Sequence, residues 1–573
     1  MNRENTPMSN TVEQASKQVF WKDISRLAIG VAIIIAINFI SQQYFFRLDL
    51  TEEKRYSINP ATKELLAQID EELEIISYLD GELNPGFQRL ERSLNETLDE
   101  FEVYAGNELK IREINPLEVV PKEEQQAFFR KLTELGIEPT YVYDEEDGQR
   151  RQKLIVPGVI INYKGQQAGV MLLNGDRAAG SQEVLNQSIE SVEYELANAI
   201  RKLINTDKKT LALIQGHGEL EGVDIVGLKS ALEEYYTVEE LNLTEVNSLP
   251  EYDVIMINKP ALRFSKQDKY KIDQYIMKGG KAMFFIDPLR INMDSIGENG
   301  SIAFPYDLNL DDQLFRYGIR INKTLVQDIK SGVYPFVVGE MAGQPQIVPL
   351  QWPFFPIVNK YGNHPAVKNM DAVFLRFPSE MDTVAADGVV KTPLMFSSEY
   401  SKVSRTPMIV DLNELREAPK PENFTAGSQA IAYLLEGNFT SLFKNRILPD
   451  VGSEQSFIAK SEPTKIVVVA DGDIVRNDIN RSNGNPLPLG YDPITERNFA
   501  NEDFVINTLS YLTDDQGLIN ARAKEIKIRP LDKVEIENNA LFYQLLNLVL
   551  PIVLIVIFGI IKAFIRKRKY ASY

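Results

Sequence analysis

The strongest constraint on this chain is an uncharged run near its C-terminus. From 541 to 561 the sequence reads LFYQLLNLVLPIVLIVIFGII and carries no formal charge. A helix of that length, rising ~1.5 Å per residue, crosses the roughly 30 Å hydrocarbon layer of a bilayer. Pro551 is compatible with such a helix, because in lipid the carbonyl that it frees has no water to bind and the helix persists with a local kink. The sequence therefore predicts a transmembrane helix over 541–561.

A basic segment, 562–573, follows this span directly. A dense positive tail beside a span predicts the cytoplasmic side. Two amides, Gln544 and Asn547, lie inside the span itself. They are either tolerated polar residues of a simple anchor or, as we favour, groups that hydrogen-bond a helix of a partner protein in the membrane. The basic residues of the tail are Lys562, Arg566, Lys567, Arg568 and Lys569.

A second uncharged run, 27–46, lies between Arg26 and Arg47. A secretory signal peptide is the alternative, but the apolar part is long, no small-x-small cleavage site precedes Gln42, and bulky aromatic residues follow. We therefore expect a retained transmembrane helix. Two spans place both termini on one membrane face, so we expect cytoplasmic ends, including a tail at 1–26, and an extracytoplasmic bulk.

Composition excludes several classes of function. The formal net charge of −19 disfavours nucleic acid as a partner, because phosphate binding depends on Lys and Arg. No cysteine is present, so disulfides and thiolate chemistry are excluded. His217 and His364 are the only histidines, which excludes a zinc site of ordinary ligand spacing. We expect no cofactor and no metal.

The first external domain is predicted over 47–180. A strand at 73–79, an amphipathic helix and a strand at 109–114 form a βαβ unit, which predicts a parallel strand pair. A helix from Pro121 and three short strands complete a thioredoxin-like α/β layer. Because a thioredoxin needs its cysteines for chemistry, we expect a spacer or docking surface. The helix stripe is Phe87, Leu90, Leu94, Leu98, Phe101 and Tyr104, and the three strands are 141–143, 159–163 and 168–173.

A long amphipathic helix, 181–206, connects this domain to a second one. Short buried strands then alternate with helices over 207–289, which predicts a doubly wound α/β sheet. From 290 to 462 the helical signal fades, and we expect a β-rich insertion. Strand-then-helix order returns over 463–530, so both ends of the insertion belong to the α/β domain. The predicted strands are 210–214, 238–241, 254–258, 282–286 and 465–469.

Polar residues follow the strands of this predicted sheet. In an open parallel sheet, ligands gather at the carboxyl ends of the strands, so these residues are candidates for ligand binding. As a group they could hold a cation or act as acid and base. The same residue types also suit ordinary turns, and that alternative stays open. The candidates are His217, Glu219, Lys259, Asp287, Asp471 and Asp473.

An aromatic cluster within the insertion has two interpretations. In the first, which we favour, Trp352, Phe354 and Phe355 form the insertion's own core, as aromatic clusters usually do. Alternatively, they form an exposed patch that docks a partner or stacks on a sugar. No phosphate loop, Gly-x-Ser-x-Gly or His-Glu-x-x-His motif is present, so ATP hydrolysis by the phosphate-loop route is excluded.

Four segments together resemble a known family. They are LDLTEEKRYS at 48–57, Gly-His-Gly-Glu at 216–219, His-Pro at 364–365 and Ala-Asp-Gly-Asp at 470–473. In their order, with a span at each end, they resemble the gliding-motility-associated ABC transporter auxiliary proteins of the GldG type. The resemblance covers nearly all of the external region and both spans.

This resemblance implies an accessory subunit, sometimes called substrate-binding, that works with a separate ATPase and a multi-span permease in bacterial gliding motility. It also implies an α/β domain related to class I glutamine amidotransferase and intraflagellar-transport-type domains. Amidotransferases use a cysteine nucleophile, and this chain has none, so that activity does not carry over.

Three functional hypotheses follow for an α/β multidomain, membrane-anchored protein. The first is a non-enzymatic auxiliary subunit of an ABC-type transporter, with the multi-span permease, the cytoplasmic ATPase through it, and membrane lipid as partners. The second is an extracytoplasmic module that binds a sugar or lipid. The third is a hydrolase built on His217 and nearby acids, which requires those groups to converge within hydrogen-bond reach.

Overall fold

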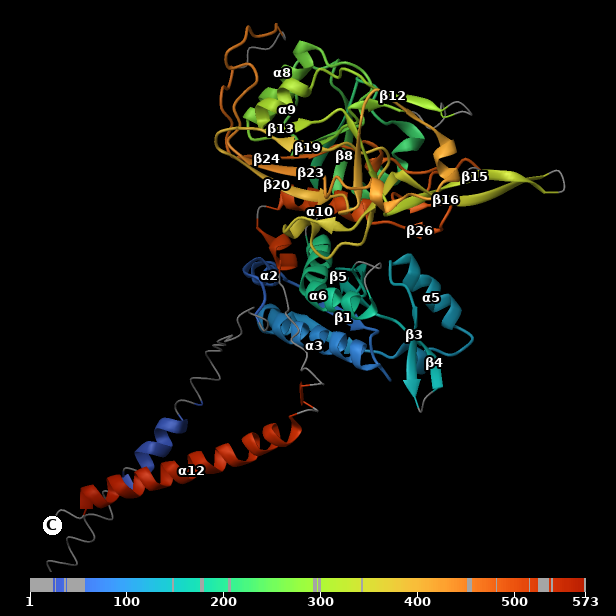
Figure 1. Ribbon diagram of the computed structural model, residues 1–573. Coiled ribbons are helices and arrows are strands. Elements are labelled where there is room, and N and C mark those ends of the chain that lie inside the picture. The colour runs from blue at the N-terminus through green and yellow to red at the C-terminus, as the bar shows by residue number, and fades with distance from the viewer. Residues whose placement is uncertain are drawn as a thin grey trace, which may run out of the picture. The chain divides into compact units, whose positions relative to one another are not determined.

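The computed structural model divides the chain into two units, 1–57 and 58–573 (Figure 1). In the first unit, residues 27–35 are helical, and most of the remaining predicted span, 36–46, lies outside the described residues. The structure describes residues 24–25, 27–35, 38, 57–146, 149–175, 180–204, 208–291, 296, 300–341, 344–450, 456–480, 482–514, 516–523, 535–536 and 539–570.

The second unit begins with a short helix and a four-stranded sheet. Helix α2 (Pro60–Leu66) is capped by Asn59, whose side chain accepts from the Ala61 N–H. The sheet has the order β2-β1-β5-β6, and its β1–β2 pair is parallel as predicted. Helix α3 (Pro85–Ala105) buries the predicted apolar stripe, with Leu90, Leu94 and Phe101 inaccessible to solvent. The strands are β1 (Leu73–Ser77), β2 (Leu109–Glu113), β5 (Gly158–Tyr163) and β6 (Gln166–Met171).

Two details of this region differ from the prediction. The strand predicted at 141–143 lies in β3 (Thr140–Glu146), which pairs with β4 (Gln149–Ile155) in a separate two-stranded sheet. The sequence of both strands is highly charged, which does not suit burial within a layer. The helix expected from Pro121 is α5 (Gln125–Glu134), preceded by the short α4 (Pro116–Val119).

Helix α6 (Ser181–Ile204) leads to an eight-stranded sheet of order β17-β20-β23-β24-β10-β9-β7-β8. The five predicted strands are present, and they are mutually parallel. Because side chains alternate along each strand, the sheet has a core on each face. Helices α7 and α10 cover one face, and α8 and α9 cover the other. The elements are β7 (Lys209–Gln215), β8 (Tyr236–Asn242), β9 (Val254–Asn258), β10 (Lys281–Phe285), β24 (Thr464–Val469), α7 (Val226–Glu233), α8 (Lys266–Met277), α9 (Asp311–Tyr317) and α10 (Asn501–Thr513).

The segment predicted as an insertion extends this same sheet. It adds β17 (Lys360–Tyr361), β20 (Val389–Phe396) and β23 (Ala430–Gly437), all antiparallel to their neighbours. Strand β23 pairs with β24 and removes what would otherwise be an exposed edge of the parallel sheet. The remaining strands are β11 (Leu289–Arg290), β12 (Ser301–Pro305), β13 (Ile319–Ile321), β14 (Thr324–Asp328), β18 (Val373–Phe374), β19 (Met381–Thr383), β21 (Ser401–Arg405), β22 (Met408–Val410), β25 (Tyr491–Asp492) and β26 (Arg497–Asn498).

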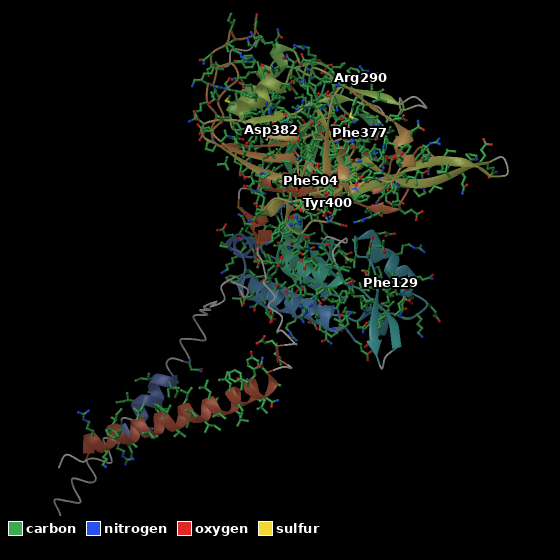
Figure 2. The ribbon with its side chains drawn as sticks, viewed as in Figure 1. Phe129, Arg290, Phe377, Asp382, Tyr400 and Phe504 are labelled. Carbon is green, nitrogen blue, oxygen red and sulfur yellow. The ribbon has the colours of Figure 1, made fainter. Side chains whose placement is uncertain are left out.

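A long hairpin, β15 (Ser331–Met341) and β16 (Gln344–Val358), extends from this domain (Figure 1). At its base, Trp352 and Phe354 are fully buried, and Phe355 is 5% exposed. The Trp352 ring contacts those of Phe355 and Phe377 at centroid distances of 4.8 and 5.6 Å (Figure 2 labels Phe377). The predicted patch is therefore a core, and these three side chains do not offer the exposed docking surface that was the alternative.

Helix α12 (Ala540–Tyr570) contains the predicted C-terminal span. Over Ala540–Arg568 its mean hydropathy reaches 2.9, and its side chains are not buried against the protein. Within the described residues it is the one helix long and apolar enough to cross a membrane. Gln544 and Asn547 are exposed on it. A helix whose apolar surface the protein leaves uncovered is suited to a lipid environment.

Candidate functional site

The predicted site residues lie at the carboxyl ends of β7, β9, β10 and β24, but they form two separate clusters. The histidine cluster consists of His217, Glu219, Asp268 and Lys271. The lysine cluster consists of Lys259, Asp287, Asp471, Asp473 and Arg376. In the described part of the chain no hydrogen bond or ion pair joins the two clusters. All six predicted residues are engaged within the protein.

His217 follows β7 in a turn whose flanking glycines, Gly216 and Gly218, have φ of 116° and 71°. This backbone conformation, which favours glycine, folds the imidazole back into the protein, where it is 3% exposed. Its Nε2 lies 3.2 Å from Asp268 Oδ2, and its Nδ1 lies 3.5 Å from Glu219 Oε1. The ring stacks on Phe264 at 3.7 Å with an interplanar angle of 10°.

These contacts fix the charge of the histidine cluster. Burial alone would lower the pKa of His217, but the hydrogen bond to Asp268 and the nearby Glu219 carboxylate raise the pKa to about 9. Burial would raise the pKa of Asp268, and the bonds from His217 and Lys271 hold that pKa well below its usual range. Lys271 Nζ lies 2.7 Å from Asp268 Oδ1. The cluster is thus an imidazolium and an ammonium balanced by two carboxylates.

A protonated imidazole has no free lone pair, so His217 in this state cannot accept a proton as a general base. The groups required by the hydrolase hypothesis do converge. They are nevertheless buried and neutralise one another, and this geometry suits a structural tie between the β7 turn and the start of α8.

Lys259 occupies the centre of the lysine cluster. Its backbone is left-handed, with φ of 53°, which directs the chain sharply at the end of β9. Its Nζ lies 3.1 Å from Asp287 Oδ2 and 2.5 Å from Asp473 Oδ2. Asp287 Oδ1 also accepts from the Gly472 N–H. The ends of β9, β10 and β24 are therefore linked through one ammonium group.

Asp471 extends the lysine cluster toward the strands added to the sheet. It accepts from the N–H groups of Arg376 and Asp473 at 2.8 and 2.7 Å. Burial raises the pKa of Asp471 and of Asp287 above the usual range. Burial also acts on Asp473, but Lys259 and Arg376 hold the pKa of that carboxyl below its usual value. Both oxygens of Asp471 are used to position backbone.

Sequence reasoning missed the partners that complete both clusters. Asp268 had a local signal in the sequence, because it stands three residues after Ser265, the residue that caps the start of α8. The Asp268 N–H donates to Ser265 Oγ at 3.1 Å. Arg376 had none, since it is 95 residues from Asp471 in the chain. Asn258, the last residue of β9, was also missed; it is fully buried, and neither side-chain amide atom has a hydrogen-bond partner in the described structure.

Residues 208–508, just over half of the chain, match the family model described as an ABC-type uncharacterized transport system. The chain belongs to this family. It is therefore an auxiliary protein of an ABC-type transport system. The histidine cluster, the lysine cluster and the β15–β16 hairpin all lie within residues 208–508, the part that matches the family model. Residues 52–162 match a second model, described as a domain of unknown function (DUF7088).

One relative matches this chain over nearly its whole length. An uncharacterized protein of Borreliella burgdorferi is 21% identical over 583 residues, which cover 96% of this chain and 98% of the relative. Among solved structures, the mmIFT52 N-terminal domain is 12% identical, with a TM-score of 0.28, and covers 53% of this chain and 97% of that one. At that TM-score the likeness supports no conclusion about the fold.

Proposed function

We propose that this protein is a non-enzymatic, membrane-anchored subunit that acts by contacting other components of its transport assembly. The observation that carries the proposal is the distal part of the β15–β16 hairpin, residues 333–351, which we call the hairpin arm. Val337, Val338 and Ile347 on the arm are 50%, 49% and 58% exposed. Val337 pairs directly with Ile347, so these two apolar side chains lie on one face of the arm, and Val338 lies beside them at a shift in the strand register.

The chemistry of the arm indicates what kind of surface covers it. A quarter of the whole chain is charged, yet Glu340 is the only charged residue between 331 and 358. Prolines interrupt its strands at 335, 345 and 349, and these residues cannot donate to an added strand. An apolar protein surface that contacts side chains, rather than an edge strand, therefore suits the arm best. We propose the multi-span permease as this partner, and the cytoplasmic ATPase as an indirect partner through the permease.

The membrane anchor provides the second proposed contact. Gln544 and Asn547 are three residues apart on α12, so they lie on one face of the helix. We propose that this face packs on a permease helix and that the apolar remainder contacts lipid. The run at 27–46 is proposed as a second span, which places both termini in the cytoplasm and the bulk in the periplasm of a bacterial inner membrane.

Finer assignments of the domains are also proposals. The order β2-β1-β5-β6 with one parallel pair supports a thioredoxin-like layer for 47–180. The parallel strands β8, β7, β9, β10 and β24 support an amidotransferase-like α/β domain over 207–289 and 463–530. The part in gliding motility rests on the sequence resemblance alone, and a surface-translocation assay on a deletion strain tests it.

For the six strand-end residues we propose a structural role in place of ligand binding. The support is that each one already bonds within its cluster. If a sugar or lipid did bind there, the ligand would shift the thermal midpoint of the full-length protein, and His217→Ala or Asp471→Ala would abolish that shift.

Co-purification of arm variants tests the docking proposal. The double variant Val337→Asp/Ile347→Asp places two charges on the arm, and Ile302→Asp/Ile409→Asp places two charges on another exposed cross-strand pair, whose side chains are 58% and 57% exposed. We expect the permease to be lost from the detergent extract of the arm variant and retained with the control. A permease that remains at wild-type levels with the arm variant would refute docking through the arm.

A further inference from the structure

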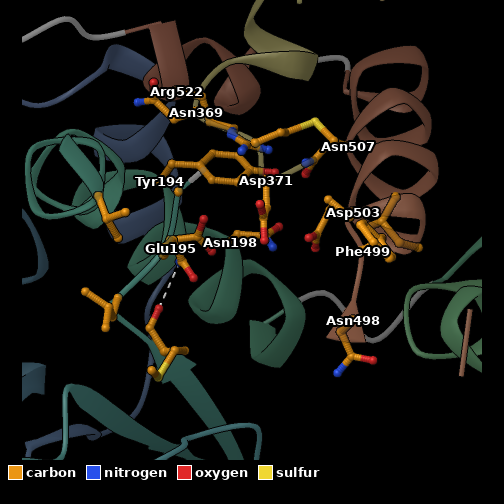
Figure 3. A pocket seen from close by; sticks show the side chains of 18 of the residues that line it. Tyr194, Glu195, Asn198, Asn369, Asp371, Asn498, Phe499, Asp503, Asn507 and Arg522 are labelled. Carbon is orange, nitrogen blue, oxygen red and sulfur yellow. Dashed lines mark hydrogen bonds between the residues drawn. The ribbon is translucent and has the colours of Figure 1, made fainter. Parts of the chain in front are cut away.

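A cavity of about 500 Å³ lies where α6 faces the start of α10 (Figure 3). It is separate from both clusters. Its walls come from segments far apart in the sequence: α6, the loop at 369–371, the segment 498–507 and Arg522. A cavity of this size is in the range of small-molecule sites.

Glu195 and Asn507 face the cavity without a hydrogen-bond or ion-pair partner among the described residues. Glu195 of α6 has no hydrogen bond or ion pair among the described residues, and Figure 3 shows it directed toward the same space as Asn198, Asp371 and Asp503. Asn507 points into the cavity from α10; it is only 8% exposed, and no described residue bonds its amide. A buried amide left unpaired costs free energy unless a ligand or water completes it.

The cavity is strongly acidic for its size. Glu138, Glu195, Asp371 and Asp503 line it, and Arg522 is the one basic residue among its described lining residues. Asp371 is also paired with Arg497 at 3.2 Å, which leaves three acidic side chains beside Arg522. Arg522 is itself engaged, because its guanidinium lies 5.1 Å from the Tyr194 ring centre and donates to the Lys368 carbonyl at 3.0 Å.

The charge of Glu195 is incompletely balanced at this position. Burial raises the pKa of Glu195 to about 7, Arg522 opposes that rise, and Asp503 adds to it. A ligand cation would supply the missing positive charge. The described residues contain no group of three or more His, Asp or Glu arranged to hold a metal ion, so an organic cation fits better.

We propose that this cavity binds a small organic amine, with its ammonium group against Glu195 and its neighbouring polar groups on Asn198 and Asn507. The site does not depend on the arm or on the anchor. It gives the auxiliary protein a ligand of its own, at the junction of the two regions that match separate family models.

Matched probes test this proposal on the full-length protein in detergent. Glucosamine and spermidine carry amines, and N-acetylglucosamine is the neutral counterpart of glucosamine. We expect titration calorimetry to detect both amines, and to find N-acetylglucosamine at least tenfold weaker than glucosamine. A charge-assisted hydrogen bond accounts for a difference of this order.

Two variants separate the site from general charge attraction. Glu195→Gln should weaken amine binding about tenfold or more. Glu183→Gln removes an equal charge from the exposed first turn of the same helix and should leave binding unchanged. Glu195→Gln should also raise the thermal midpoint without ligand, because it removes a half-buried carboxylate that no described residue bonds, and this readout shows that the variant folds.

Three results would overturn the proposal. One is absence of amine binding to the wild-type protein at millimolar concentration, and another is equal binding of glucosamine and N-acetylglucosamine. The third is an equal loss of affinity in Glu195→Gln and Glu183→Gln, which would indicate general attraction of cations to an acidic surface.

Discussion

The histidine cluster makes the stability of this protein depend on pH in a predictable direction. The pKa of His217 is about 6.5 in an unfolded chain and rises to about 9 in the fold. A group whose folded pKa is raised stabilises the fold fully below its unfolded pKa, and that contribution is lost as pH rises through the folded pKa. A difference of this size corresponds to about 3 kcal/mol of stability, lost between roughly pH 6.5 and pH 9.

The assay uses the fact that the chain has only two histidines. With ring-labelled histidine, nuclear magnetic resonance should show two titrations, that of His217 near pH 9 and that of His364 below its usual range, because burial lowers the pKa of His364. Urea unfolding, followed through the buried Trp352 in a Trp21→Phe background, measures the stability at each pH.

Asp268→Asn is the decisive perturbation. It removes the carboxylate 3.2 Å from His217 Nε2, so much of the rise in the pKa of His217 and of the pH-dependent stability should disappear, with Glu219 accounting for the remainder. Asp382→Asn is the matched control, since it breaks an exposed pair with Arg320 and should cost below about 1 kcal/mol at any pH. A His217 that titrates near pH 6.5, or an unchanged pH profile in Asp268→Asn, would refute this account of the cluster.

Three further comparisons test the structural account by urea unfolding, followed by far-ultraviolet circular dichroism. Lys259→Met leaves two largely buried carboxylates, Asp287 and Asp473, without their ammonium partner and should cost about 3–5 kcal/mol at pH 7. The cost should be smaller under acid conditions, and an equal cost at both pH values would argue against the ion pairs. Asn258→Leu removes an unpaired buried amide and should be neutral or stabilising by about 1 kcal/mol. Asn477→Leu breaks two part-buried hydrogen bonds of a buried side chain and should destabilise; the opposite order would contradict the assignment. Trp352→Ala should cost about 3–5 kcal/mol as a core truncation, while Val337→Ala on the arm should change stability by less than about 0.5 kcal/mol.

Much of the fold followed from local periodicity. The stripe at spacings of three and four predicted α3, and short apolar runs such as 254–258 and 465–469 predicted the parallel strands. The extension of the sheet by β23 could not be predicted in this way. Its pairing with β24 joins distant segments, and no local pattern marks which strand becomes the neighbour of which.

The candidate site was predictable only to the level of the sheet edge. The rule for parallel strands placed Lys259, Asp287 and Asp473 at one end of the sheet, and the structure brings these three together. It does not join them to His217, because helix α8, which follows β9, supplies a carboxylate, Asp268, that lies 3.2 Å from the imidazole. Such choices depend on distances of a few ångströms between loops, which residue spacing does not encode.

The central claim is that this protein works by contact with transporter components, and its companions in the membrane test that claim most directly. The full-length protein should be extracted in mild detergent, purified through a tag and examined by quantitative mass spectrometry. We predict a multi-span permease and an ATPase in fixed ratio to it. Recovery of the protein alone, or with soluble proteins in variable amounts, would contradict the account.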